Sequence, residues 1–151
     1  MKTKIFVLYC LFVLFNLTGC SNNDGPRTEY VEGTVIFNGE PLSKALVAFH
    51  PVNDTGIAAT GTTNEQGIFR LTSLRGGTKD AGAVAGEYRV AISRNKDEPS
   101  SFREEESADG RISKIPVFES LIPKKYNHPA KSGLTVTVEK KKNQFQFSLE
   151  K

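Results

Sequence analysis

Histidine and cysteine, which often act as general bases, nucleophiles and metal ligands, are scarce in this 151-residue chain. The sequence has two of each, His50 and His128, and Cys10 and Cys20. A zinc site needs three or four converging ligands, and the chain has neither an H-x-x-H nor a C-x-x-C spacing. It also lacks the G-x-S-x-G motif of a nucleophilic serine. These patterns predict a protein that is not an enzyme and has no metal or other cofactor.

Cys20 is the residue whose surroundings indicate a specific reaction. Lys2 and Lys4 precede an apolar run over residues 5–15, and Leu-Thr-Gly-Cys at residues 17–20 closes it. This order is typical of a secretory signal peptide, and the run is shorter than the roughly 20 residues of a membrane-spanning helix. The four residues resemble the bacterial lipobox. The resemblance implies that signal peptidase II removes residues 1–19 and that the Cys20 sulfur carries a diacylglyceryl group.

The lipobox resemblance also implies a location. The mature chain would be a lipoprotein of the cell envelope, acylated with fatty acids such as palmitate and attached to the membrane through Cys20. Residues 20–29 are polar and contain Gly25 and Pro26, so we expect a short lipidated tether. In enteric bacteria an aspartate close behind the cysteine retains lipoproteins in the inner membrane. Here Ser21 and Asn22 follow Cys20, which favours the outer membrane.

The charge balance argues against a nucleic-acid partner. Without residues 1–19 the chain has 132 residues, and the loss of Lys2 and Lys4 leaves 18 basic against 17 acidic residues, a formal charge of +1. A nearly neutral chain lacks the basic surface that nucleic-acid binding requires. Since Cys10 leaves with the signal peptide, Cys20 has no disulfide partner within the mature chain. We therefore expect a domain stabilised by a hydrophobic core.

Alternating apolar and polar residues predict the elements that would position any binding surface. The alternation has the period of two that is typical of strands, and Asn38-Gly39 is a strong hairpin signal. No helix is predicted after the signal peptide. The predicted strands cover residues 30–37, 45–50, 57–63, 68–72, 87–93, 134–138 and 143–149. Seven short strands at this spacing predict an all-β sandwich. The side chains predicted inside it are Phe37, Val47, Phe49, Phe69, Leu71, Val90, Ile92, Val136, Val138, Phe145 and Phe147.

A charged insert at about residues 94–113 interrupts this rhythm. It has few apolar residues to bury, so we expect a long solvated loop with a short helical turn at residues 101–106. Residues 115–122 would touch the domain again, and residues 123–132 would form an irregular connector to the last two strands.

Three stretches resemble the carboxypeptidase-regulatory-like domains. They are Val-Glu-Gly-Thr-Val, Asn-Gly-Glu-Pro-Leu and Ala-Leu-Val-Ala-Phe within residues 31–49, Thr-Thr-Asn-Glu-Gln-Gly-Ile-Phe at residues 62–69, and Gly-Glu-Tyr-Arg-Val at residues 86–90. Asn64 stands where the family more often has aspartate, and Ala85 replaces a proline. The resemblance covers residues 30–150 apart from the charged insert. It implies the prealbumin-like, seven-stranded Greek-key sandwich that the family shares with transthyretin.

These observations predict a structural or binding role in the envelope, with an envelope protein or a glycan as partner. An alternative is a carbohydrate- or peptide-binding surface module, for which Tyr126, Asn127 and His128 in the connector offer side chains. A transthyretin-like hydrolase is a further alternative, but those enzymes end in Tyr-Arg-Gly-Ser and this chain ends in Ser-Leu-Glu-Lys. A self-catalysed Lys–Asn cross-link, as in adhesin repeats of this fold, would use Asn143 and Glu87, but residues 30–37 contain no lysine.

Overall fold

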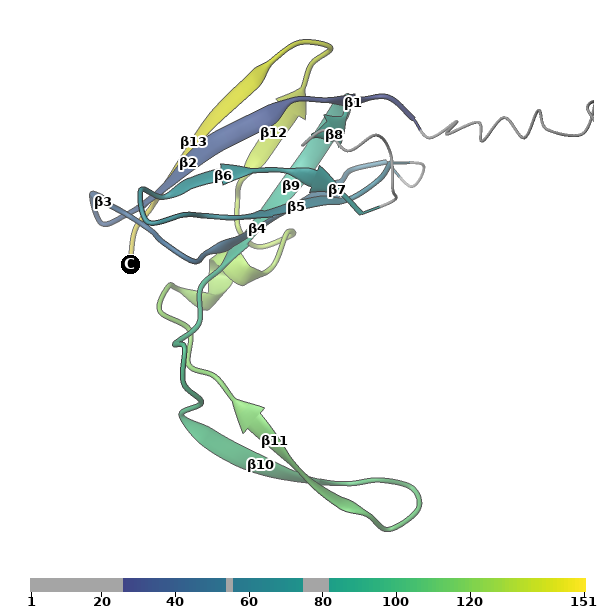
Figure 1. Cartoon of the computed structure of the whole chain (residues 1–151), viewed down its shortest axis with the longest axis vertical. Coiled ribbons are helices and arrows are strands. Elements are labelled where there is room, and N and C mark those ends of the chain that lie inside the picture. Colours follow the sequence, from purple (N-terminus) through teal and green to yellow (C-terminus); the bar gives the residue numbers. More distant parts are fainter. Residues whose placement is uncertain (1–25, 54–55, 75–81) are drawn as a thin grey trace, which may run out of the picture.

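Two β-sheets packed face to face form the body of the molecule, and a two-stranded arm extends from it (Figure 1). The computed structural model describes residues 26–53, 56–74 and 82–151. The prediction of an all-β sandwich is confirmed. Residues 1–19 and Cys20, to which the predicted signal peptide and lipid anchor belong, lie outside the described residues. Within the part that is described, no helix has both the length and the hydrophobicity to cross a membrane.

The first sheet has five strands in the order β12–β9–β4–β5–β7, and every neighbouring pair is antiparallel. Its longest strand, β9, buries Tyr88, Val90 and Ile92 on one face and exposes Arg89 on the other, as its alternating sequence predicts. The strands are β12 (Thr135–Val138), β9 (Gly86–Ser93), β4 (Leu46–Pro51), β5 (Ala59–Thr62) and β7 (Thr72–Ser73).

The second sheet is centred on β2, which β13 joins in a parallel register from Asn143 opposite Val31 to Leu149 opposite Phe37. The strands β3 and β6 are antiparallel to β2. The predicted hairpin turn lies between β2 and β3, where Asn38 and Gly39 have φ angles of 50° and 89°. These left-handed values match a two-residue hairpin turn. The strands are β13 (Asn143–Leu149), β2 (Val31–Phe37), β3 (Glu40–Pro41) and β6 (Ile68–Arg70).

One predicted strand, residues 68–72, takes part in both sheets. Its first half is β6, which pairs with β2, and its second half lies in β7, which pairs with β5. The fully buried Leu71 lies between them. This division and the short β3 give the two sheets more strands than the predicted seven. Three small elements accompany the two sheets. β1 (Thr28–Glu29) and β8 (Ala83–Val84) form a separate two-stranded sheet, and η2 (Lys124–Asn127) is a 3-10 helix.

Aromatic rings fill the space between the sheets. Phe49, which is fully buried, lies at the centre, with ring-centroid separations of 5.7–6.4 Å to its four aromatic neighbours. Those neighbours are Phe69, Tyr88, Phe145 and Phe147. Most of the predicted core is buried, and only Phe37, Val136 and Phe145 are half-buried and pack against it from the rim. The remaining predicted core residues, all buried, are Val47, Phe49, Phe69, Leu71, Val90, Ile92, Val138 and Phe147.

The charged insert is where the prediction was wrong. Instead of a loop with a helical turn, it forms an antiparallel hairpin of β10 (Ser101–Glu106) and β11 (Ile112–Val117). The Ser107 N–H bonds to the Arg111 carbonyl at 2.8 Å, and Gly110 has a φ of 79° in the turn. This is the geometry of a three-residue hairpin loop that ends in a left-handed glycine. The register also places Glu104 opposite Lys114, so unlike charges face each other across the arm.

Candidate functional site

The sequence suggested that Tyr126 lies on an exposed binding surface. In the structure this side chain instead packs inside the molecule. Its side chain is 7% exposed within η2. The hydroxyl donates to the Glu150 carbonyl at 3.3 Å and accepts from the Glu150 N–H at 3.2 Å. These bonds fasten the connector to the residue that follows β13.

Asn127 and His128 are exposed beside Tyr126. The Nδ1 of His128 accepts a bond from the Ala130 N–H at 3.2 Å, which stabilises the turn that follows η2. His50 lies far along the chain on β4, exposed and opposite Arg89 of β9. Among the described residues, no three His, Cys, Asp or Glu side chains gather in a way that could hold a metal ion.

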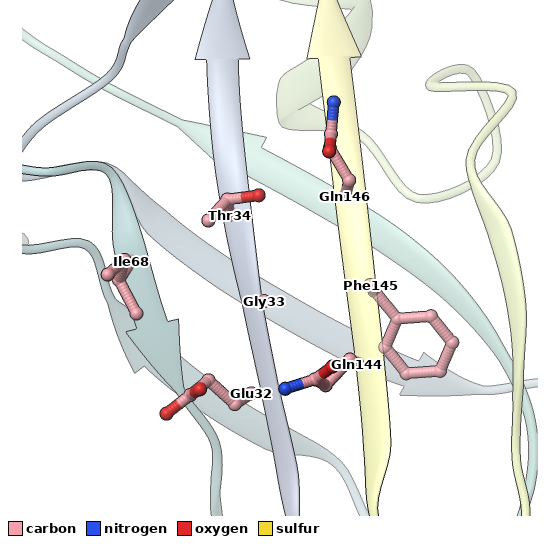
Figure 2. A pocket seen from close by; sticks show the side chains of 7 residues that line it. All are labelled: Glu32, Gly33, Thr34, Ile68, Gln144, Phe145 and Gln146. Atoms are coloured by element: carbon pink, nitrogen blue, oxygen red, sulfur yellow. The ribbon is translucent and has the colours of Figure 1, made fainter.

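A shallow polar pocket lies on the outer face of the second sheet, with a volume of about 370 Å³. Figure 2 shows its walls: Glu32 and Thr34 from β2, Ile68 from β6, and Gln144 and Gln146 from β13. In the same view the Gln144 amide reaches across β2 towards Glu32, whereas the Phe145 ring points away from these side chains. The strands position the group because every second residue of β2 and β13 faces outward.

Glu32 is held in a hydrogen-bonded cluster at one end of this pocket. Its Oε2 accepts from the Arg70 Nε at 2.7 Å and from the Tyr30 hydroxyl at 2.8 Å. Both donors stabilise the carboxylate, first Arg70 and then Tyr30, and they lower the pKa of Glu32. The pKa of Tyr30 is raised, chiefly because its hydroxyl donates to that carboxylate. Lys142 lies with its Nζ 5.6 Å from the centre of the Tyr30 ring.

The chemistry of this pocket suits binding better than catalysis. Glu32 stays ionised at neutral pH and its oxygen is already occupied by two donors, which does not suit a general acid. Thr34, Gln144 and Gln146 supply neutral hydrogen-bond donors and acceptors. The sequence analysis did not identify this site, although the outward-facing polar residues of the first and last strands were a usable signal. Their convergence depends on the parallel pairing of β2 with β13, which no local pattern indicates.

The side-chain amide of Asn143 forms its hydrogen bonds with backbone groups. Asn143 lies opposite Val31 of β2 rather than opposite a lysine. Its Nδ2 donates to the carbonyls of Lys141 at 2.6 Å and Glu139 at 3.0 Å, and its Oδ1 accepts from the Glu139 N–H at 2.9 Å. The amide therefore closes the turn between β12 and β13. This geometry does not fit the Lys–Asn cross-link considered from the sequence.

Comparisons with known proteins assign no family to this chain. No protein-family model matches the chain, and no curated protein matches it. One similar solved structure is BcpA, the major pilin subunit of Bacillus cereus, with 14% identity and a TM-score of 0.39. Another is a 9R-lipoxygenase from Cyanothece PCC8801, with 15% identity and a TM-score of 0.38. The matches cover 83% and 84% of this chain but only 30% of the pilin subunit and 17% of the lipoxygenase. Likenesses of this size assign no activity or partner.

Proposed function

We propose that this chain is a lipid-anchored, non-enzymatic β-sandwich of the bacterial cell envelope with a structural or binding role. The observation that carries the proposal is Leu-Thr-Gly-Cys at residues 17–20, directly behind a charged and apolar leader. Cys20 is the acylated residue. Of the predicted tether at residues 20–29, the last two residues, Thr28 and Glu29, lie in β1 of the folded domain. Ser21 and Asn22 support sorting to the outer membrane.

The turn geometry supports a carboxypeptidase-regulatory-like domain within this proposal. At Asn64, where the family more often has aspartate, the Oδ1 accepts from the N–H groups of Gln66 at 3.0 Å and Ile68 at 2.9 Å. An aspartate oxygen would accept the same two bonds, so the substitution preserves the turn chemistry. Gly67 completes the turn with a φ of 72°. Turn geometry as well as the sequence motif therefore supports the resemblance to carboxypeptidase-regulatory-like domains.

The anchor is tested by intact mass and membrane partitioning of the expressed full chain. We expect the wild type to begin at Cys20, to carry acyl mass and to sediment with membranes, whereas Cys20→Ser keeps residues 1–19 and gains no acyl mass. Cys10→Ser is the matched control, because it removes the cysteine that lies within the leader and should be processed like the wild type. Equal processing of the Cys20→Ser chain would refute the lipoprotein proposal.

A second candidate function, binding of a glycan or an extended peptide, is favoured by the polar pocket in Figure 2. Gln144 and Gln146 present amides of the kind that bind sugar hydroxyls and peptide groups. The test is titration with soluble peptidoglycan fragments and, separately, with a polar peptide. Binding by the wild type that Gln144→Ala weakens, and that Thr137→Ala on the other sheet leaves unchanged, would support this function. Flat titrations with both probes would refute it.

A further inference from the structure

The edge of β13 is unusually open for a sheet of this kind. Proteins protect exposed edges with short strands, charges or prolines, and the other sheet edges of the described residues follow this rule. β3 has two residues and includes Pro41, β7 has two residues, and β12 has four. β13 has seven residues, Asn-Gln-Phe-Gln-Phe-Ser-Leu, with no charge, proline or glycine. Within the described part of the chain it pairs with β2 alone.

The strands of the arm are protected too. β10 carries four consecutive charged residues from Arg103 to Glu106, and β11 contains Pro116. An added strand would have to pair beside charges or beside a residue without an N–H. This contrast leaves β13 as the long unprotected edge among the described strands.

Backbone bonds show which groups of β13 are available. The Asn143 N–H donates to the Tyr30 carbonyl, and the Leu149 carbonyl accepts from the Asn38 N–H, each at 3.0 Å. Backbone groups of alternate residues in a strand point to opposite sides, so the odd-numbered residues bond towards β2. Gln144, Gln146 and Ser148 therefore direct their N–H and C=O groups towards the open side. The Tyr126 hydroxyl occupies the backbone of Glu150 and ends the open stretch there.

We propose that this edge pairs antiparallel with β13 of a second copy of the chain, with the two-fold axis at Gln146. In this register Gln146 faces Gln146, and Gln144 of each copy faces Ser148 of the other. Each hydrogen-bonded pair exchanges two N–H···O bonds, so the three pairs contribute about six. On the inner face, the half-buried Phe145 of one copy lies opposite Phe147 of the other, and both copies extend their cores.

The charges at the ends of β13 favour the second copy as the occupant. Lys142 precedes the strand and Glu150 follows it, and within the described residues neither side chain forms an ion pair. Antiparallel pairing about Gln146 directs Lys142 of each copy towards Glu150 of the other. Parallel pairing would bring like charges together at both ends. The strand is thus complementary to itself in one direction only, and the pairing does not depend on the lipid anchor.

Cysteine cross-linking tests the register directly. The full chain is prepared with Cys10→Ser and Cys20→Ser, so that an introduced cysteine is the only thiol. We expect Gln146→Cys to form a disulfide-linked dimer on mild oxidation, because hydrogen-bonded antiparallel partners lie about 5.5 Å apart between Cα atoms. Gln144→Cys and Ser148→Cys should each link poorly alone, since the Cα atoms of identical residues would lie about 14 Å apart. A mixture of these two variants should link well.

Thr137→Cys, exposed on the edge strand β12, is the matched control for random collision. Equal cross-linking by this control, or by Gln144→Cys alone, would overturn the proposal. Sedimentation of the uncross-linked protein gives an independent readout. The wild type should dimerise as concentration rises, and Gln146→Lys should weaken the dimer about fivefold to tenfold because two lysines then face each other. Thr137→Lys should have no effect. A wild type that stays monomeric at its highest soluble concentration would also overturn the proposal, whatever the result for lipidation.

Discussion

The sandwich and the arm are both made of paired strands, yet only the sandwich has an interior. β9 ends at Ser93 in the sandwich, and the chain then continues through residues 94–100 to β10 of the arm. Tyr88, Val90 and Ile92 of β9 are at most 2% exposed. In the arm every residue of β10 is exposed, and Phe102 of that strand is 63% exposed. Strand pairing alone therefore does not create a core.

The arm is stabilised by cross-strand bonds and by its base instead of by burial. Lys96 and Glu119, which lie on the two segments at the base of the arm, form an ion pair of 2.5 Å. Asp97 pairs with Arg94 at 3.0 Å and with Lys44 of the sandwich at 2.8 Å, which fastens the base to the turn before β4. An isolated two-stranded hairpin is only marginally stable in water. From this comparison we expect the sandwich to set the global stability and the arm to open independently.

The largest test of this difference removes an aromatic ring from each region. Phe49→Ala deletes a fully buried ring with four aromatic neighbours, and we expect a loss of about 3–5 kcal/mol in the free energy of unfolding. Phe102→Ala removes a ring that is mostly in solvent, and the change should stay within about 0.5 kcal/mol. Urea unfolding followed by circular dichroism measures both. Comparable losses would mean that the arm has a hidden packing partner.

A smaller test compares a buried polar group with an exposed one. Asn143→Ala leaves backbone groups at the β12–β13 turn without partners, and we expect a loss of about 1–3 kcal/mol. Ser100→Ala removes a bond of 3.0 Å to the Val117 carbonyl, but at an exposed position where water replaces it. The Ser100 change should be close to neutral in the same unfolding assay. A neutral Asn143→Ala would show that the turn amide is dispensable.

The sequence predicted the sandwich well because its strands obey one physical rule. Burial on one face produces the alternation seen at Val90 and Ile92, and it can be recognised without knowing the partner strand. The arm was missed because its charges were interpreted as a sign of a loop. Asp109-Gly110 is a hairpin signal of the same kind as Asn38-Gly39, and the structure has a left-handed glycine at both turns.

The candidate site was less predictable because it depends on tertiary pairing. Glu32 and Gln144 are more than a hundred residues apart and meet only because β13 joins β2 in parallel. Tyr126 illustrates the opposite failure. Tyr126 lies in a polar connector, yet it packs into the hydrophobic core and bonds to Glu150, and local sequence indicates neither contact. Local patterns thus predicted faces and turns, whereas contacts between distant strands required the structure.

The smallest expected effect is a pH-dependent change in the mobility of the arm relative to the sandwich. Lys44 and then Arg94 lower the pKa of Asp97. Because the folded pKa is lowered, the ion pairs are fully present above the ordinary aspartate pKa of about 3.9, and they are lost as the pH falls through the lower folded value. We therefore expect the backbone order parameters of the arm to fall in acid while those of the sandwich change little. Asp97→Asn should give the arm its acid-like mobility already at neutral pH and remove this part of the pH dependence. An arm whose order parameters are the same in wild type and Asp97→Asn at neutral pH would show that the ion pairs at its base do not hold it to the sandwich.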